Sequence, residues 1–117
     1  MNFDATASLP GKPPALITRR AQDARSYLVD CTALLREHEL LVRVLDTTPA
    51  IALAPDTPPA GLRIQRAVVW GTCTALLIDL AGGEPAAGRP SQDWPVSVRL
   101  KTTQGYLNVA LMVRVHA

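Results

Sequence analysis

The side chains that could perform chemistry in this chain of 117 residues are scattered rather than grouped. His38 lies between two glutamates in the segment REHE, and His116 is the penultimate residue. A zinc site needs three or four ligands, and neither histidine has a second ligand at metal spacing. We therefore expect both histidines to lie at the surface, and we expect neither a metal nor another cofactor.

The ten carboxylates are dispersed as well, mostly in segments that are typical of loops. The sequence leaves a paired-carboxylate hydrolase open as an alternative, because nothing selects one pair over another. The glycine-rich segment AGGEPAAG, residues 81–88, lacks the Lys-Ser/Thr sequence that completes a phosphate-binding loop. With no reactive cluster in view, we expect a binding or assembly module rather than an enzyme.

Charge and cysteine content narrow the class of protein further. The net charge of +2 is too mild for a nucleic-acid-binding face. No apolar run reaches the roughly 20 residues that span a bilayer, and the first 20 residues lack the pattern of a secretory signal. Cys31 and Cys73 lie far apart with no CxxC motif. These features predict two free thiols, a soluble product of a reducing cytoplasm, and no nucleic-acid or membrane partner.

The end of the chain has the pattern of an antiparallel hairpin. Apolar and polar residues alternate over 96–101 and again over 107–115, on either side of the turn TTQG. Successive side chains of a strand point to opposite faces, so one face of this hairpin should be buried. The residues expected on the buried face are Leu107, Val109, Leu111, Val113 and Val115.

The remaining elements are short. Strand patterns occupy 27–29, 40–45, 51–54, 62–66 and 68–80, and composition predicts a loop over 81–95. The long run over 68–80 places Trp70 in the core. A helical turn is expected within DCTALLREHE, capped by Asp30 or Thr32, and a single amphipathic helix over 29–44 is an alternative. The fold class is all-β: a small immunoglobulin-like antiparallel sandwich over 27–117 with one short helical turn.

Residues 1–26 differ in composition from the rest and predict an extended arm. Three prolines hold the backbone extended, and three apolar residues have no partner segment nearby in the sequence. We expect this arm to dock on a neighbouring chain. Its arginines either pair with an acidic partner or stay solvated. The expected contact residues of the arm are Leu9, Pro10, Pro13, Pro14, Leu16, Ile17, Arg19 and Arg20.

Trp94, in the segment QDWP, has two interpretations. It is either a binding aromatic in a protein–protein interface or a plug at one end of the sandwich. A carbohydrate- or receptor-binding β module is a further alternative, in which Trp94 and Tyr106 would be exposed stacking residues.

From Tyr27 onward the order of motifs resembles the phage fibre–tail adaptor family. The resemblance lies in a Tyr-x-x-Asp strand start with a leucine-rich turn, a Pro-x-Gly-Leu step, a strand that leads to a Gly-Gly loop, and a last hairpin with a Thr-Thr-x-Gly turn. The corresponding segments here are YLVDCTALL, TPPAGLRI, ALLIDLAGGEPAAG and WPVSVRLKTTQGYLNVALMVRV.

This resemblance implies a structural protein of a tailed bacteriophage particle. Such a protein would be made in the bacterial host cytoplasm and reside in the virion, at the tail or the head–tail junction. Its partners would be other virion proteins, the portal or adaptor on one side and the tail fibre on the other. It would act as a homo-oligomer or ring. A head decoration protein, which clamps capsid subunits from outside, is the alternative role within the particle.

Overall fold

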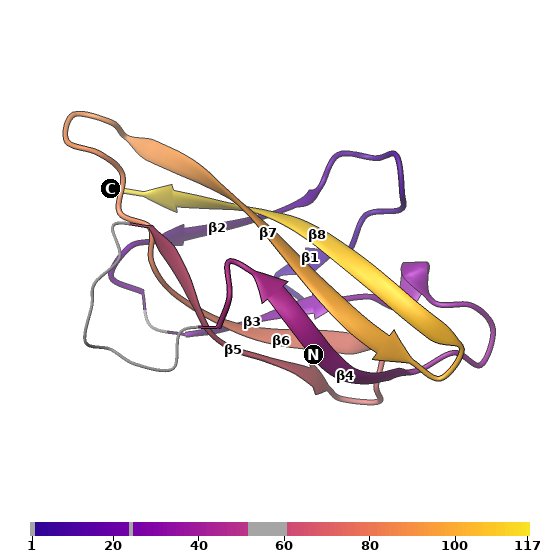
Figure 1. The fold of residues 1–117 in the computed structure, drawn as a ribbon. Helices are drawn as coiled ribbons and strands as arrows, with labels where there is room; N and C mark the ends of the chain where they lie inside the picture. Colours follow the sequence, from indigo (N-terminus) through magenta and orange to yellow (C-terminus); the bar gives the residue numbers. More distant parts are fainter. Residues whose placement is uncertain (1, 24, 52–60) are drawn as a thin grey trace.

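The computed structural model describes residues 2–23, 25–51 and 61–117, which form two four-stranded sheets packed face to face (Figure 1). One sheet has the strand order β1-β3-β6-β5 and the other the order β2-β8-β7-β4. The elements are β1 (Ala5–Thr6), β2 (Ala15–Arg20), β3 (Ser26–Asp30), the 3-10 turn η1 (Thr32–Leu34), β4 (Leu41–Thr48), β5 (Leu62–Trp70), β6 (Ala75–Gly82), β7 (Ser91–Thr102) and β8 (Gly105–His116). The expected all-β sandwich with one short helical turn is confirmed.

The strand order is that of an immunoglobulin-like sandwich. In such domains strands A, B, E and D form one sheet and strands C, F and G the other. Here β1, β3, β6 and β5 take the first set of places, and β4, β7 and β8 take the second. Two edge pairs, β1 with β3 and β2 with β8, are parallel, so the expectation of a wholly antiparallel sandwich is wrong at these two edges.

The C-terminal hairpin forms as predicted, and it is longer than expected. β7 and β8 pair without a break from Ser91 opposite His116 to Thr102 opposite Gly105. The residues of β8 predicted to face inward are buried, except for Leu107, which is half-buried. The expected loop over 81–95 therefore ends at residue 90, because residues 91–95 pair with the end of β8.

The predicted strand over 68–80 is instead two strands joined by a tight turn. Gly71 and Cys73 have positive φ values of 68° and 64°, and the chain reverses between Trp70 and Ala75. The reversal breaks the single alternating face on which the prediction depended. Trp70 is consequently 44% exposed at the end of β5, and its expected place in the core is wrong.

The segment after β3 is a 3-10 turn, and the alternative of a helix over 29–44 is wrong. The carboxylate of Asp30 accepts hydrogen bonds from the backbone N–H and the hydroxyl of Thr32, at 3.0 and 2.6 Å. Such local side-chain bonds favour a turn over a continuing helix. The chain then enters β4, whose pairing with β7 is interrupted by two bulges, after Leu41 and after Val44.

The N-terminal segment belongs to the sandwich, and the expected boundary at residue 26 is wrong. β2 pairs with β8 over six residues, and β1 joins the other sheet beside β3. Ala7 and Ile17 are 3% and 2% exposed, so both are core residues. The prediction of an arm on a neighbouring chain overlooked the alternation in ALITRR, which gives β2 one buried face.

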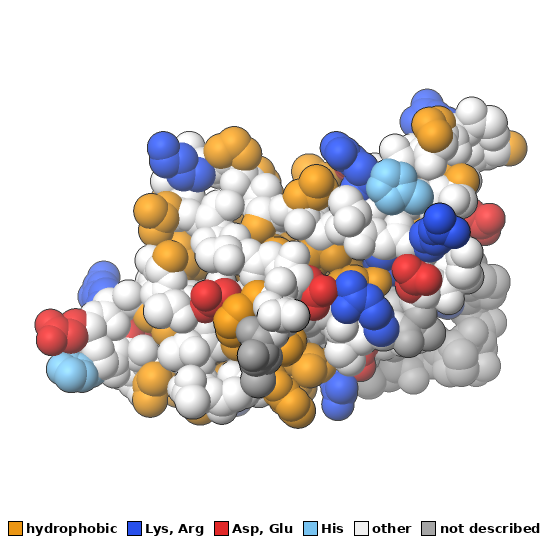
Figure 2. Space-filling model, turned by 180° about the vertical axis from the view of Figure 1, so that it is seen from behind, with side chains coloured by type: hydrophobic (Ala, Val, Ile, Leu, Met, Phe, Trp, Pro, Cys, Tyr) orange, Lys and Arg blue, Asp and Glu red, His pale blue; other side chains and the backbone are white. Residues whose placement is uncertain are grey.

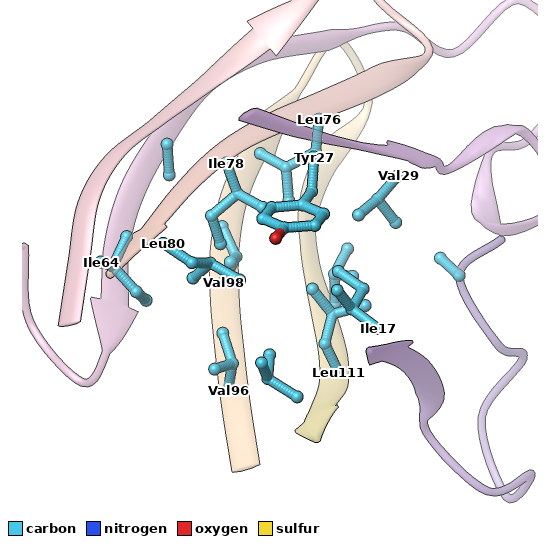
Figure 3. Close-up of a cluster of buried hydrophobic side chains, with 14 of the residues drawn as sticks. Ile17, Tyr27, Val29, Ile64, Leu76, Ile78, Leu80, Val96, Val98 and Leu111 are labelled. Carbon is cyan, nitrogen blue, oxygen red and sulfur yellow. The ribbon is translucent and has the colours of Figure 1, made fainter. Parts of the chain in front are cut away.

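The core lies between the two sheets and, among the described residues, its fully buried side chains are aliphatic apart from the Tyr27 ring and the Cys31 thiol (Figure 3). Tyr27 is fully buried, and its ring lies among aliphatic side chains of both sheets. Of the expected strand over 51–54, only Ile51 falls in the described part of the chain, where it forms a parallel bridge with Ile64. Residues 52–54 lie outside the described residues.

Candidate interaction surface

The outer face of the β2–β8–β7–β4 sheet carries an exposed apolar row at its centre. Leu16, Met112 and Pro95 lie opposite one another on three adjacent strands. Leu16 is 42% exposed, Pro95 is exposed and Met112 is half-buried. A shallow hollow of about 210 Å³ adjoins this row, and Pro14, Ser97 and Ala110 are among its lining residues. We call Leu16, Met112 and Pro95 the apolar row.

A charged group lies on the same face toward the end of β8. The guanidinium of Arg114 donates two hydrogen bonds to the carboxylate of Asp93, at 2.8 and 3.1 Å. These bonds lower the pKa of Asp93 and raise the pKa of Arg114. Arg89 and His116 also line the open hollow of about 540 Å³ beside this pair. As expected, His116 is exposed, and so is His38 on the far loop.

A third group lies at the opposite end of the face, beside the β7–β8 turn. Tyr106 is 64% exposed, and the cationic groups of Arg99 and Lys101 lie 5.3 and 5.1 Å from the centre of its ring. Leu40 and Val42 add exposed apolar surface where the chain enters β4.

The predicted contact residues of the N-terminal segment separate into two sets. One set is on the surface, where Leu9 is 50% exposed and an apolar hollow of about 280 Å³ lies between this loop and β8. The members of this exposed set are Leu9, Pro10, Pro13, Pro14, Leu16 and Arg20. The other set, Ile17 and Arg19, is buried within the chain itself, so the prediction that these two contact a neighbour is wrong.

Arg19 is 3% exposed and acts within the fold. Its guanidinium donates hydrogen bonds to the backbone carbonyls of Gly82 at 2.7 Å, Asp23 at 2.7 Å and Ala21 at 3.3 Å. The bond to Gly82 connects β2 to the end of β6 in the opposite sheet, and the other two hold the turn that follows β2. Both alternatives for Arg19, a solvated side chain and an acidic partner, are therefore wrong. Residue type alone does not predict that the methylene groups of an arginine are buried while its guanidinium reaches backbone carbonyls.

Trp94 lies at the end of the sandwich as a plug. It is half-buried, and its indole N–H donates a hydrogen bond to the carbonyl of Gly83 at 3.0 Å. A Cβ at Gly61 or Gly83 would lie within 3.3 Å of the indole, so both glycines permit its close approach. Of the two interpretations, the structure supports the plug.

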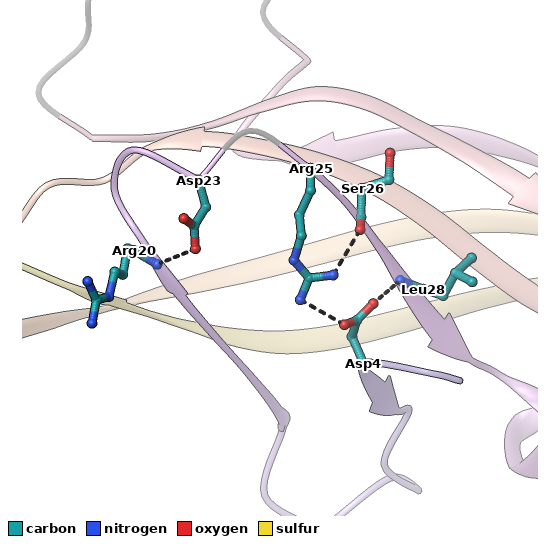
Figure 4. Close-up of polar contacts among 6 residues, drawn as sticks. All are labelled: Asp4, Arg20, Asp23, Arg25, Ser26 and Leu28. Carbon is teal, nitrogen blue, oxygen red and sulfur yellow. Dashed lines mark hydrogen bonds and ion pairs between the residues drawn. The ribbon is translucent and has the colours of Figure 1, made fainter. Parts of the chain in front are cut away.

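Polar contacts fasten the N-terminal segment to β3 and to the turn after β2 (Figure 4). Asp4 accepts hydrogen bonds from the Arg25 guanidinium at 2.9 Å and from the Leu28 backbone N–H at 2.8 Å. The hydrogen bond to Asp4 raises the pKa of Arg25. The Arg20 backbone N–H donates to the Asp23 carboxylate at 3.2 Å, and the Arg20 side chain is exposed on the outer face of β2.

Charges of both signs are mixed with hydrophobic side chains over the face seen in Figure 2. Among residues 2–23, 25–51 and 61–117, no three His, Cys, Asp or Glu side chains are grouped so that they could hold a metal ion. Cys31 and Cys73 are both free thiols, as predicted. Within the same described ranges, none of the helical segments has the length and apolar character needed to cross a membrane.

No protein-family model, curated protein or solved structure matches this chain.

Proposed function

We propose that this chain is a binding module that joins proteins in a tailed bacteriophage particle, as a fibre–tail adaptor. The observation that carries the proposal is the apolar row of Leu16, Met112 and Pro95, exposed at the centre of the β2–β8–β7–β4 sheet. The motif order from Tyr27 to the last hairpin supports the same proposal through the resemblance described above.

The arrangement around the apolar row has the composition of a protein–protein contact. Such contacts combine an apolar centre with a polar rim. Here the Asp93–Arg114 pair provides charged groups on the same face, two residues along β7 and β8 from Pro95 and Met112. Because the row spans three paired strands of one sheet, its side chains are held in fixed relative positions, which reduces the entropic cost of binding.

A carbohydrate-binding module fits these positions less well. That alternative required Trp94 and Tyr106 as exposed stacking residues, and Trp94 is half-buried with its N–H bonded to Gly83. Of these two residues, Tyr106 remains available for stacking, and two cations lie close to its ring.

The proposal is tested with particles of the phage or prophage that encodes the chain. A tagged copy of the chain should co-purify with particles through a density gradient, and a map of the particle should place it between the tail and the fibres. A position on the capsid shell instead would assign the head decoration role. Absence of the chain from gradient-purified particles, while it is abundant in the lysate, would refute a virion role of either kind.

Two matched variants test the apolar row itself. Leu16→Asp introduces a charge into the row, whereas Trp70→Asp changes a residue of similar exposure in the other sheet, 44% against 42%. We expect Leu16→Asp to reduce incorporation into particles and Trp70→Asp to leave it unchanged, with both variants folded by circular dichroism. Equal incorporation of the two variants would exclude the apolar row as the contact.

A further inference from the structure

The exposed surface beside the β7–β8 turn has the character of a second, separate binding site. Lys101 lies opposite Tyr106 on β8 and opposite Arg43 on β4, so three strands place these side chains in one line across the sheet. Arg99 lies two residues before Lys101, on the same face of β7. We call Leu40, Val42, Arg43, Arg99, Lys101 and Tyr106 the hairpin-tip patch.

The cations of the hairpin-tip patch have no acidic partner within the described chain. Ion pairs among residues 2–23, 25–51 and 61–117 do not include Arg43, Arg99 or Lys101. The nearby carboxylate of Glu39 is engaged elsewhere, because it accepts hydrogen bonds from the Arg36 backbone N–H and the Thr102 hydroxyl. Asp46 lies opposite Arg99 in the β4–β7 pairing, but none of the ion pairs of the described residues joins the two. Three positive charges therefore lie together on one face, with one carboxylate at the margin.

Contact with an aromatic ring orders two of these cations. Arg99 and Lys101 both lie close to the ring of Tyr106, at 5.3 and 5.1 Å from its centre, within the range of cation–π attraction. Long basic side chains lose less entropy on binding when they are already held in place. Tyrosine and arginine are also the residue types that most often dominate the affinity of protein contacts.

The patch has an apolar side as well. Leu40 is 41% exposed and Val42 is 48% exposed, and both precede Arg43 on the way into β4. The aliphatic side chains of Leu40 and Val42 can pack against the apolar side chains of a peptide that also carries carboxylates. They make no favourable contact with the phosphate backbone of a nucleic acid. A chain with a net charge of +2 also lacks the extended basic surface on which nucleic-acid binding depends.

We propose that the hairpin-tip patch binds an acidic segment of a protein partner, one that carries apolar side chains between its carboxylates. Carboxylates of the segment pair with Arg43, Arg99 and Lys101, and an apolar side chain packs against Tyr106 and Val42. The inference rests on the proposed function only in treating the chain as a binding module, and it does not require that the partner belong to a virion.

The test uses the full chain and a fluorescein-labelled peptide composed of Glu, Asp and Leu, with anisotropy as the readout. The comparison peptide replaces every Glu by Gln and every Asp by Asn. We expect the acidic peptide to bind and the amide peptide to bind at least about tenfold more weakly. Binding should also weaken as salt rises from about 0.1 M to about 1 M, because exposed charges are then screened.

Three variants locate the site on the surface. Tyr106→Ser and Lys101→Glu should each reduce affinity about tenfold, because each removes part of the ordered cation–ring group. Arg89→Glu makes the same change of charge as Lys101→Glu at the other end of the β7–β8 hairpin, and it should alter affinity by less than about twofold. Thermal melts of all three variants check that the fold is retained.

Several outcomes would overturn the inference. Equal binding of the acidic and amide peptides would show that the patch does not recognise carboxylates. If neither peptide bound, the patch would not be a binding site for such segments. Tighter binding of a single-stranded DNA oligomer than of the acidic peptide would assign the patch to nucleic acid. An equal loss in Arg89→Glu and Lys101→Glu would show an effect of net charge alone. None of these outcomes bears on incorporation into particles, so the proposed function is tested independently.

Discussion

Ile17 of β2 lies directly opposite Val113 of β8 in a parallel strand pair, and the two side chains are 2% and 0% exposed. Nearly a hundred residues of chain separate them in the sequence. The N-terminal strand β2 thus contributes to the same core as the C-terminal hairpin. Side chains from both ends of the chain therefore contribute to one core.

Ile17→Ala should destabilise the protein by about 2–5 kcal/mol, because it leaves a cavity between the sheets. Leu16→Ala is the matched control, since Leu16 is the adjacent residue and its side chain is 42% exposed. Urea unfolding followed by circular dichroism measures both variants. A similar midpoint for the two would mean that β2 is not part of the core and that the segment is an arm after all.

Gly83→Ala should destabilise the end of the sandwich that Trp94 plugs. Gly83 has a φ of +76°, and an added Cβ would lie 3.0 Å from the Trp94 indole nitrogen and 3.1 Å from a methyl of Val115. Overpacking of this kind costs about 1–3 kcal/mol, in addition to the backbone strain. Thermal melts and the tryptophan emission maximum should both shift.

Gly88→Ala provides the control for that prediction. Gly88 has a comparable φ of +84°, but an added Cβ there would meet nothing within 4 Å. Its loss should be limited to backbone strain, about 1–2 kcal/mol. If Gly88→Ala were as harmful as Gly83→Ala, the contact with Trp94 would contribute nothing.

The hairpin could be predicted from the sequence, and the strand beside it could not. In residues 105–116 the alternation is long and the turn is adjacent, so period and partner are both visible locally. The alternation in β2 is only six residues long and follows a proline-rich segment, and its partner lies at the far end of the chain. Local pattern does not reveal a parallel partner at that separation.

The turn between β5 and β6 was missed for a different reason. Cys73 has a positive φ, a conformation in which the usual residues are Gly, Asn and Asp. The run VVWGTCTALLIDL therefore resembles one continuous strand, and Gly71 alone does not predict a reversal of the chain. For the candidate site, the outward positions of β8 could be predicted from alternation, but the rows across β2, β7 and β4 require the register of the folded sheet.

The two thiols should differ sharply in reactivity. Burial raises the pKa of Cys31 to about 12, with a smaller contribution from the nearby Asp30 carboxylate, so this thiol stays protonated. Cys73 is partly exposed in its turn. One thiol should react rapidly with DTNB in the folded protein and a second only in denaturant. A Cys73→Ser variant should lose the rapid reaction, and a rapid reaction that persists in it would place Cys31 at the surface.

The raised pKa of Cys31 also predicts a loss of stability in alkali. The folded chain keeps this proton where the unfolded chain has released it, so the unfolded state binds fewer protons above the ordinary thiol pKa of about 8.5. The stabilisation is complete below that value and is lost as pH rises toward the folded pKa. Urea midpoints at about pH 7 and about pH 10 should show a decline that is smaller in Cys31→Ala.

Glu39 should contribute to stability at neutral pH and lose that contribution in acid. Its pKa is lowered, first by the hydrogen bond from the Arg36 backbone N–H and then by that from the Thr102 hydroxyl. A lowered folded pKa means that the contribution is present above the unfolded value of about 4.3 and disappears as pH falls through the folded value.

Glu39→Gln should therefore reduce the acid sensitivity of the fold between about pH 5 and about pH 2. Asp93→Asn is the comparison, because the pKa of Asp93 is also lowered, in this case first by its hydrogen bond with Arg114. Urea unfolding across this range measures the slope for each protein. An unchanged slope in Glu39→Gln would show that the carboxylate is equally free in the folded and unfolded chains.

The two bulges of β4 make this edge of the sheet a poor site for pairing with another strand. β4 is the outer strand of its sheet, and its hydrogen-bonding rhythm is broken after Leu41 and after Val44. Bulges increase the twist of a strand, so a strand of another molecule pairs poorly with it. Many natural proteins have bulged edge strands, which limit edge-to-edge aggregation. Even at high protein concentration, pairing of a second molecule with this edge is therefore disfavoured, and the sheet does not extend from one molecule to the next through β4.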